Sequence, residues 1–262
     1  MRHLLLLAAG ALLPSLVLWP PAAAATQFFA SGAVEHAGVH ELARPARLSD
    51  AALAAGVRED AYVLGAAWLR PGLRMEQQRQ QAGILFDLDH VRRQALASDR
   101  IALAEFCASL SAWLGSMPST GRQAAPLDPR VVDVMPSANR PVAQGDVLYY
   151  PTRPSTIRIV GAVSRTCELP QVALQDARRY LDACPALPLA DADWIFVIQP
   201  DGQVFRQGIG LWNRSTPLPL APGAVVYVPL GDRLVRDVAP DLNREIATFL
   251  ATQPLADPEA HP

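Results

Sequence analysis

The chain contains no lysine, so all 23 of its basic residues are arginine, against 25 acidic residues and a formal net charge of −2. A balance this close to zero lacks the basic patch that binds phosphate backbones, and we expect no nucleic-acid partner. Catalytic signatures are missing as well, since the sequence has no GxSxG, no glycine-rich phosphate loop and no HExxH. The histidines do not follow metal-site spacing. We therefore expect no metal and no cofactor.

Long hydrophobic runs are absent except at the N-terminus. Arg2 and His3 precede an almost wholly apolar run, residues 4–18, which two prolines and the alanines at 22–25 follow. This order is typical of a signal peptide. A membrane anchor is the alternative, but 15 helical residues reach only about 22 Å, less than the ~30 Å of the hydrocarbon core. We predict a signal peptide over residues 1–25, a mature protein in the periplasm, and no spanning of the membrane by the mature chain.

Cysteine is scarce, with only Cys107, Cys167 and Cys184 present. An odd number leaves at least one thiol unpaired or available to another chain. Secretion permits a disulfide, and three different single bridges are possible. Cys167 and Cys184 fall in the same expected domain, which favours that bridge, although geometry rather than closeness in sequence decides. Three buried thiols without any bridge are the alternative.

What the sequence does contain is an internal repeat. The tetrapeptide SGAV at 31–34 has a counterpart, VGAV, at 160–163. The heptapeptide GDVLYYP at 145–151 has a counterpart, GAVVYVP, at 223–229. The opening pair is separated by 129 residues and the closing pair by 78. The first copy of the repeat therefore carries additional residues in its interior.

Those additional residues follow a helical pattern. Ile84, Leu88 and Val91 recur at helical spacing, and a second run at 101–114 does the same. Two consecutive amphipathic runs of this kind predict a pair of helices. We assign residues 75–122 to a helical insertion together with the loop that follows it.

Each copy mixes strands with one helix. In the second copy, residues 156–160 alternate as a half-buried strand, 173–183 suit a helix, and 194–198 are strongly β-forming. A small sheet around one helix buries the apolar face of both. We therefore predict an α+β fold of two β-grasp domains, the first interrupted by the insertion, with a C-terminal amphipathic helix and a disordered tail. The predicted boundaries are 26–74 with 123–154 for the first domain, 155–235 for the second, 236–253 for the helix and 254–262 for the tail.

The order of the motifs resembles that of known families. The strand IRIVGAV, the turn QPDGQV and the closing PLAPGAVVYVP, all within residues 157–229, resemble the soluble ligand-binding β-grasp (SLBB) repeat of outer-membrane polysaccharide export proteins. The additional motifs are AYVLGAAWLR, MPSTGR at 117–122 and QGDVLYYPTRPSTIRIVGAV. Together with these motifs, nearly the whole mature chain resembles the capsule biosynthesis GfcC family. Members of that family have a signal peptide, two β-grasp domains, a helical insertion and a terminal amphipathic helix.

The resemblance implies a candidate ligand site. In the family, the arginine of the MPSTGR-type loop lies in a cleft, and here that residue is Arg122. The planar fork of an arginine suits the carboxylate or phosphate of an acidic sugar. Pairing with Asp128, or the capping of a backbone carbonyl, is the structural alternative. The candidate ligand-binding set is Arg122, Asp128 and Trp68.

The tryptophans could also stack on sugar rings, whose C–H faces suit aromatic side chains. Trp68 in GAAWLR at 65–70 and Trp212 in GLWNR at 210–214 take matching places in the repeat by this comparison, which favours a role in the fold over ligand stacking. Trp194 lies in an apolar strand, so we expect it in the core.

The C-terminal helix has two interpretations. Leu242, Ile246, Phe249 and Leu250 form one apolar stripe on it. The stripe can pack on the helix's own domain, which is the usual fate of an amphipathic helix. The same four residues can instead dock on a partner of an export complex, and they are the candidate docking residues.

The leading functional hypothesis is a non-catalytic periplasmic accessory protein of capsule or exopolysaccharide assembly or export. Its partner would be a polysaccharide or an outer-membrane polysaccharide export protein. One alternative is a polysaccharide-modifying enzyme, which would need two carboxyl groups a few ångströms apart across a groove. The other is a purely structural scaffold of the export complex that makes no sugar contact.

Overall fold

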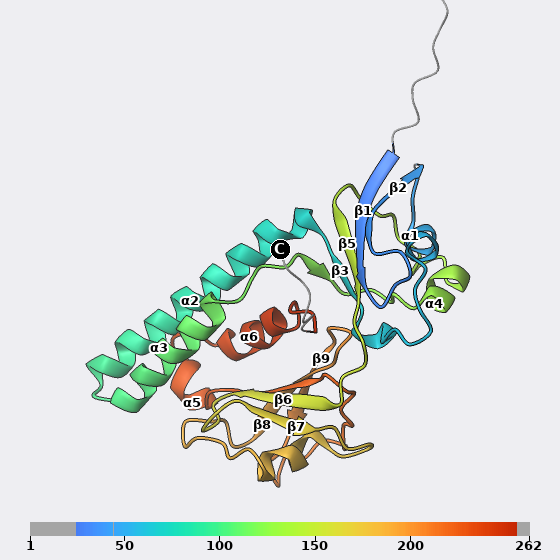
Figure 1. Cartoon of the computed structure of the whole chain (residues 1–262). Helices are drawn as coiled ribbons and strands as arrows, with labels where there is room; N and C mark the ends of the chain where they lie inside the picture. Colours follow the sequence, from blue (N-terminus) through green and yellow to red (C-terminus); the bar gives the residue numbers. More distant parts are fainter. Residues whose placement is uncertain (1–24, 44, 256–262) are drawn as a thin grey trace, which may run out of the picture.

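The computed structural model describes residues 25–43 and 45–255 (Figure 1). The predicted signal peptide, residues 1–25, lies outside these ranges except for Ala25, with which the first strand begins. Residues 256–262 of the predicted tail also lie outside them. Pro254 and Leu255 are described, and a Cβ added at Gly65 would come within 2.5 Å of Leu255 Cδ1. Leu255, the second residue of the predicted tail, therefore packs against the first domain.

The first domain is a five-stranded mixed sheet with the strand order β2-β1-β5-β3-β4. Strands β1 and β5 are parallel neighbours in its centre, and the other pairs are antiparallel. Two helices, α1 and α4, contribute to a core on one face of the sheet. The elements are β1 (Ala25–Gly32), β2 (Gly38–Ala43), α1 (Leu48–Ala55), η1 (Val63–Gly65), β3 (Ala67–Leu69), η2 (Pro71–Leu73), β4 (Arg122–Gln123), α4 (Pro129–Val134) and β5 (Asp146–Tyr150).

The second domain repeats this topology with the strand order β7-β6-β10-β8-β9, in which β6 and β10 are the parallel pair. Both sheets thus have the β-grasp arrangement, and the predicted α+β class is confirmed. The elements of this domain are β6 (Thr156–Gly161), β7 (Cys167–Pro170), η3 (Ala177–Asp182), β8 (Trp194–Ile198), β9 (Val204–Gly208) and β10 (Val225–Val228).

The helix predicted at 173–183 is wrong in length and type. The structure has a 3₁₀ helix, η3, of six residues in its place. The preceding residues cannot join it, because Leu174 adopts a left-handed φ of 60°. The Val172 amide donates to the Tyr180 hydroxyl at 2.8 Å. A side chain of η3 thus holds the segment before it in a non-helical conformation.

Register confirms the repeat at its opening motif. Gly32 pairs with Tyr150, and Gly161 pairs with Val228 at the equivalent point of the second sheet. Both glycines have positive φ, 83° and 97°. A Cβ at either would lie 2.1 or 2.2 Å from the carbonyl oxygen of its partner. Only glycine fits, because both the space and the backbone conformation exclude a side chain.

Register also corrects one pairing within the repeat. Trp68 lies opposite Leu148 on β5. Val226 on β10 is the equivalent of Leu148, and Val197 lies opposite Val226. The counterpart of Trp68 is therefore Val197, and the match with Trp212 is wrong. Trp212 follows β9 and is 75 % exposed. The shared letters of the two short motifs do not reflect a shared position in the sheet.

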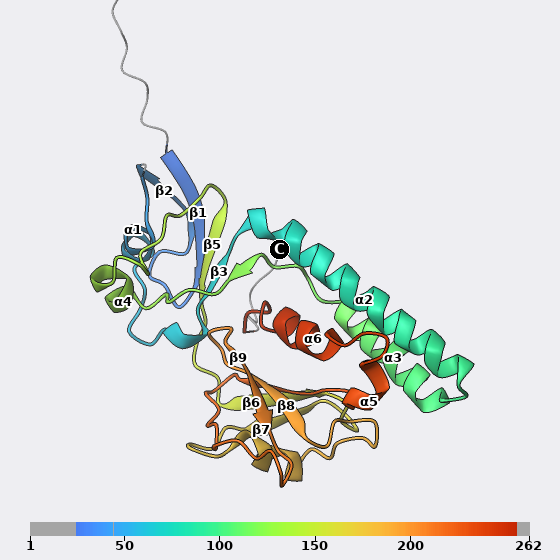
Figure 2. The ribbon, with the colours of Figure 1, turned by 180° about the vertical axis from the view of Figure 1, so that it is seen from behind.

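The insertion between β3 and β4 is a hairpin of two helices, α2 (Arg74–Ala97) and α3 (Ile101–Gly115). Ile84, Leu88 and Val91 are all buried along α2, as their helical spacing predicts. The hairpin extends away from the first sheet and over the second domain (Figures 1 and 2). It therefore packs into a hydrophobic core that contains residues of the second sheet and, in the described chain, none of the first.

That core is closed by the C-terminal segment, α5 (Asp232–Val235) and α6 (Leu242–Leu250). Helix α6 lies between the hairpin and the second sheet (Figures 1 and 2). Its buried stripe shares one hydrophobic cluster with α2, α3, β8 and β10. The predicted segment 236–253 thus contains a helix of nine residues that is covered on both sides. The four stripe residues Leu242, Ile246, Phe249 and Leu250 are between 0 and 6 % exposed.

This burial argues against the docking role proposed for the stripe and agrees with packing on the helix's own chain. A partner could reach these side chains only if α6 left the space between hairpin and sheet. Burial of each large apolar side chain stabilises the fold by about 1.5–3 kcal/mol relative to exposure.

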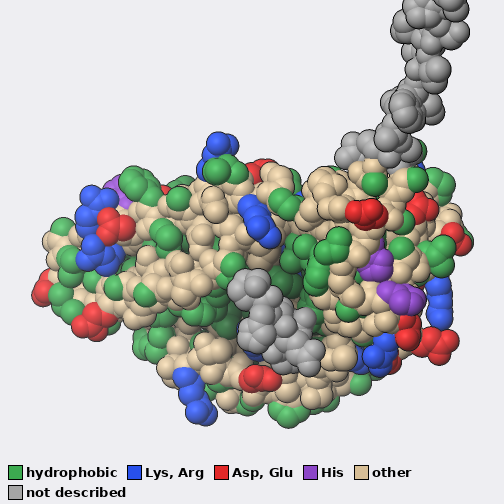
Figure 3. All heavy atoms as spheres, turned by 45° about the horizontal axis from the view of Figure 1, so that its top comes forward, with side chains coloured by type: hydrophobic (Ala, Val, Ile, Leu, Met, Phe, Trp, Pro, Cys, Tyr) green, Lys and Arg blue, Asp and Glu red, His purple; other side chains and the backbone are tan. Residues whose placement is uncertain are grey.

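On the face shown in Figure 3, charged side chains gather mostly toward the two ends, with hydrophobic side chains in the hollow between them.

Two further facts bear on the earlier expectations. Cys167 and Cys184 form a disulfide, which is one of the three bridges that the sequence left open, and Cys107 is a buried free thiol. Within residues 25–43 and 45–255, the helices are all too short or too polar to cross a bilayer.

We expect Phe249→Ala to lower the free energy of unfolding by about 3–5 kcal/mol, because it opens a cavity where hairpin, helix and sheet meet. Thr248→Ala, on the exposed side of the same helix, should change it by less than about 0.5 kcal/mol. Urea unfolding followed by circular dichroism measures both. Equal stabilities of the two variants would contradict the buried position of α6.

Cys107 should resist alkylation in the native protein. Burial raises the pKa of its thiol to about 11, so at pH 8 only about one molecule in a thousand carries the reactive thiolate. We expect iodoacetamide without reductant to label the native chain slowly and the denatured chain at one cysteine, as read by mass spectrometry. Labelling of three cysteines in denaturant would contradict the Cys167–Cys184 bridge.

Candidate functional site

Arg122, the arginine of the MPSTGR loop, begins β4 and is 7 % exposed. Its Nη1 donates to the carbonyl oxygens of Ala251 at 3.3 Å and Gln253 at 3.1 Å. Its Nη2 donates to the carbonyl oxygens of Ala66 at 3.4 Å and of Pro200. One guanidinium thus joins the first domain, the second domain and the segment that follows α6.

The charge of Arg122 is held by these carbonyl dipoles, since in the described part of the chain no carboxylate lies within ion-pair distance of it. Burial lowers the pKa of Arg122 to about 10, and the charge of Asp201 acts in the opposite direction. The group remains protonated at neutral pH. Of the structural alternatives, the structure shows carbonyl capping.

The loop before Arg122 is built to place it. Gly121 has a φ of 76°, and a Cβ there would lie 2.2 Å from the carbonyl oxygen of Arg70. Gln77 on α2 accepts from the Gly121 amide through Oε1 at 2.7 Å. The Thr120 hydroxyl donates to the carbonyl oxygen of Thr252 at 2.7 Å. The threonine and the glycine of this motif therefore each have a structural role. Thr120 binds the segment after α6, and Gly121 allows the loop to approach the backbone of Arg70.

The other two members of the predicted set lie elsewhere. Asp128 accepts from the Arg130 amide at 2.9 Å and caps α4. It also lines a pocket of about 420 Å³ between the domains, together with Asp201. Trp68 is 0 % exposed, and its Nε1 donates to Asp146 Oδ2 at 2.8 Å. This burial argues against a sugar-stacking role for Trp68.

Binding of an acidic sugar at Arg122 stays a prediction. For a ligand to reach the guanidinium, it would have to displace the carbonyl oxygens of the segment after α6. The three predicted residues do not converge on one cavity, because each is engaged by a different part of the fold.

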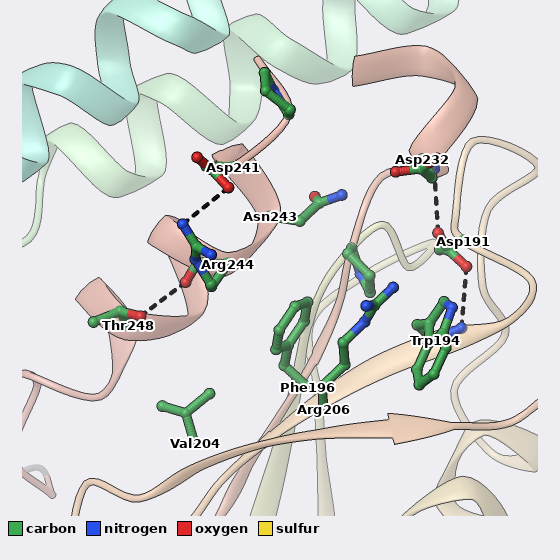
Figure 4. A pocket seen from close by; sticks show the side chains of 12 residues that line it. Asp191, Trp194, Phe196, Val204, Arg206, Asp232, Asp241, Asn243, Arg244 and Thr248 are labelled. Carbon is green, nitrogen blue, oxygen red and sulfur yellow. Dashed lines mark hydrogen bonds and ion pairs between the residues drawn. The ribbon is translucent and has the colours of Figure 1, made fainter. Parts of the chain in front are cut away.

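A second site lies over the second sheet, where two adjoining pockets of about 470 and 630 Å³ share four of their lining residues. Figure 4 shows the first of these pockets, between α6 and strands β8 and β9. We call the two together the Trp194 groove. Its shared residues are Asp191, Trp194, Arg206 and Asp232, with Arg244 in the first pocket and Trp212 in the second.

Arg206 lies on the floor of the groove, on β9, one of the two edge strands of the second sheet. Its guanidinium carbon lies 3.8 Å from the centroid of the Trp194 ring, a cation–π contact visible in Figure 4. The described residues give it no ion pair and no hydrogen bond from its side chain. An exposed arginine fork is thus fixed over an indole with its donors unused.

The carboxylates of the groove are largely engaged. Asp191 Oδ1 accepts from the amides of Asp193 at 2.8 Å and Trp194 at 3.0 Å, and Oδ2 accepts from the Asp232 amide at 3.1 Å. Asp241 forms an ion pair with Arg244 at 2.9 Å. The acidic residues at this site therefore serve the protein's own structure.

Sequence analysis missed the groove because it placed Trp194 in the core. Along β8, Ile195 and Val197 point into the core beneath the sheet, and Phe196 shares the α6 face. By alternation Trp194 also belongs to that outer face, at the end of the strand, where it is only half-buried. The period-2 pattern was a usable signal, but whether α6 extends far enough to cover the ring is decided by tertiary packing.

Comparison with known proteins covers both domains. The family model described as capsule biosynthesis GfcC, N-terminal, matches residues 22–153, and the model described as capsule biosynthesis GfcC C-terminal matches residues 165–254. The chain belongs to the capsule biosynthesis GfcC family. The GfcC N-terminal match contains the insertion and Arg122, and the GfcC C-terminal match contains the Trp194 groove and α6.

A relative is found in Escherichia coli (strain K12). The uncharacterized protein YjbG is 30 % identical to this chain over 172 residues, which cover 66 % of this chain and 68 % of YjbG. Membership of the GfcC family supports a role in capsule assembly, as the resemblance implied.

Arg122→Gln should lower the free energy of unfolding by about 3 kcal/mol. The shorter amide leaves at least two buried carbonyl oxygens without a donor, and each such loss costs about 1–3 kcal/mol. Arg130→Gln makes the same chemical change at an exposed position and should have an effect below about 0.5 kcal/mol. Urea denaturation of the three proteins measures the difference. If Arg122→Gln is as stable as the wild type, the guanidinium does not hold the domains together.

Proposed function

We propose that the protein is a non-catalytic periplasmic accessory protein of capsule or exopolysaccharide assembly or export, and that it acts by binding the polysaccharide. Membership of the GfcC family is the observation that carries this proposal. The signal-peptide pattern of residues 1–25 supports the compartment. The Trp194 groove supports the polysaccharide as the ligand, because it offers indole rings and an unused arginine on an open surface.

The arrangement suits equilibrium binding of a polymer. The groove lies on a sheet that α6 and the hairpin brace from one side, so its residues are held on rigid elements. An open groove also lets a chain pass through without threading its ends. An outer-membrane export protein is the alternative partner, and a scaffold without sugar contact is the alternative role.

A gene deletion in the native bacterium tests this role. We expect the deletion to reduce the polysaccharide recovered from the cell surface, and the full chain to restore it. A chain without residues 2–25 should accumulate in the cytoplasm and fail to restore it, because it cannot reach its site. Immunoblots of cell fractions control for the amount of each form. Wild-type surface polysaccharide in the deletion strain would contradict the proposal.

The enzyme alternative has one observation in its favour, since Asp128 and Asp201 line the same pocket between the domains. Glycoside cleavage uses two carboxyl groups that flank the scissile bond. In our proposal, the purified protein releases no reducing ends from the polymer. Release that is lost in both Asp128→Asn and Asp201→Asn would instead identify an enzyme.

A further inference from the structure

We propose that the Trp194 groove binds an acidic sugar unit, with Arg206 holding its carboxylate and Trp212 stacking on a neighbouring ring of the same polymer. The inference rests on the proposed function in one respect, which is that the ligand is a polysaccharide. It adds the chemical class of the sugar and the residues that select it.

The charges of the groove favour an anion. Among its arginines, Arg244 is paired with Asp241 at 2.9 Å, and Arg236 lies 3.7 Å from Asp232. Arg206 lines both pockets and Arg233 lines the second, and neither has a carboxylate within ion-pair distance in the described chain. The groove therefore contains arginines, Arg206 above all, that are not held in an ion pair with one of its own carboxylates.

Two carboxylates of the groove, Asp191 and Asp193, are turned toward donors of the protein itself. Asp191 accepts three backbone amides, as described above. Asp193 Oδ1 accepts from Trp212 Nε1 at 2.8 Å. A neutral sugar is commonly held by carboxylates that accept its hydroxyl protons. Here Asp191 accepts through both of its oxygens and Asp193 through one, whereas all the donors of Arg206 are open.

Arg206 is also held in place for such a contact. Its guanidinium lies over the Trp194 indole at 3.8 Å, which limits the orientations of an otherwise mobile side chain. Carboxylates bind an arginine through two parallel hydrogen bonds, and the stacked face leaves the N–H edges available for both. The cost in side-chain entropy on binding is reduced, because the fork is already restrained.

Trp212 supplies the second contact proposed for the polymer, and it lines the pocket of about 630 Å³ together with Arg206. Its ring is 75 % exposed, yet the hydrogen bond from Nε1 to Asp193 fixes its orientation. A large exposed indole that is held in one position is a platform for the C–H face of a sugar ring. A polymer that lies along the groove can then meet Trp212 and Arg206 with successive units.

Binding of defined oligosaccharides to the purified mature protein tests the site. The probes are oligogalacturonate and the same oligosaccharide after reduction of its carboxyl groups, at equal length, measured by isothermal titration calorimetry. We expect the wild type to bind the acidic form at least tenfold more tightly. Arg206→Gln should weaken binding of the acidic form about tenfold and remove this discrimination, because it removes the charge and the fork.

Three further variants sharpen the test. Trp212→Ala should weaken both probes by a similar factor, because stacking does not depend on the carboxylate. Arg206→Lys should recover only part of the affinity, since an ammonium cannot bind bidentately. Arg79→Gln makes the same charge change on an exposed part of α2 and should leave both affinities unchanged. Circular dichroism checks that each variant is folded.

Equal binding of the two probes by the wild type would overturn the acidic-sugar site, as would full affinity in Arg206→Gln. Absence of binding to either probe would also overturn it. None of these results affects the deletion phenotype, so failure of the inference is distinguishable from failure of the proposed role in polysaccharide assembly or export. A deletion phenotype without oligosaccharide binding would point to the scaffold role.

Discussion

The architecture depends on one buried guanidinium. Arg122 donates to carbonyl oxygens from Ala66, Pro200, Ala251 and Gln253, which belong to both β-grasp domains and to the segment after α6. A buried positive charge is costly unless its donors are satisfied. Because no single element supplies enough acceptors, the charge is stable only when all these segments are in place. This requirement couples the placement of the two domains to the position of the segment that follows α6.

The hairpin and α6 extend the same coupling. The insertion begins and ends within the first sheet, yet its apolar face packs with α6 on the second sheet. Removal of α6 would expose the facing surfaces of both the hairpin and the second domain. The two domains are therefore related by sequence repetition but not independent in packing. The face that α6 covers on the second sheet also determines where the Trp194 groove begins.

Arginine serves two opposite purposes in this lysine-free chain. Arg122 is enclosed, and its donors are used by the protein's own carbonyls. Arg206 is exposed over Trp194, and its donors are unused. The MPSTGR motif drew attention to the first, because glycine and threonine at fixed positions mark a constrained loop. No local motif marks the second, since its neighbours in space, Asp191 and Trp212, come from separate loops.

The sequence by itself determined the two β-grasp units, the helical insertion and the closing amphipathic helix. These depend on local periodicity and on glycines such as Gly32 and Gly161, whose backbone positions admit no side chain. Only the tertiary structure decided which cysteines pair, that Trp68 corresponds to Val197, and that the α6 stripe is buried within its own chain. It also decided that Arg206 keeps its donors free within the Trp194 groove. The physical reason is that period and turn chemistry act between near neighbours, whereas burial and charge pairing depend on segments that meet only after folding.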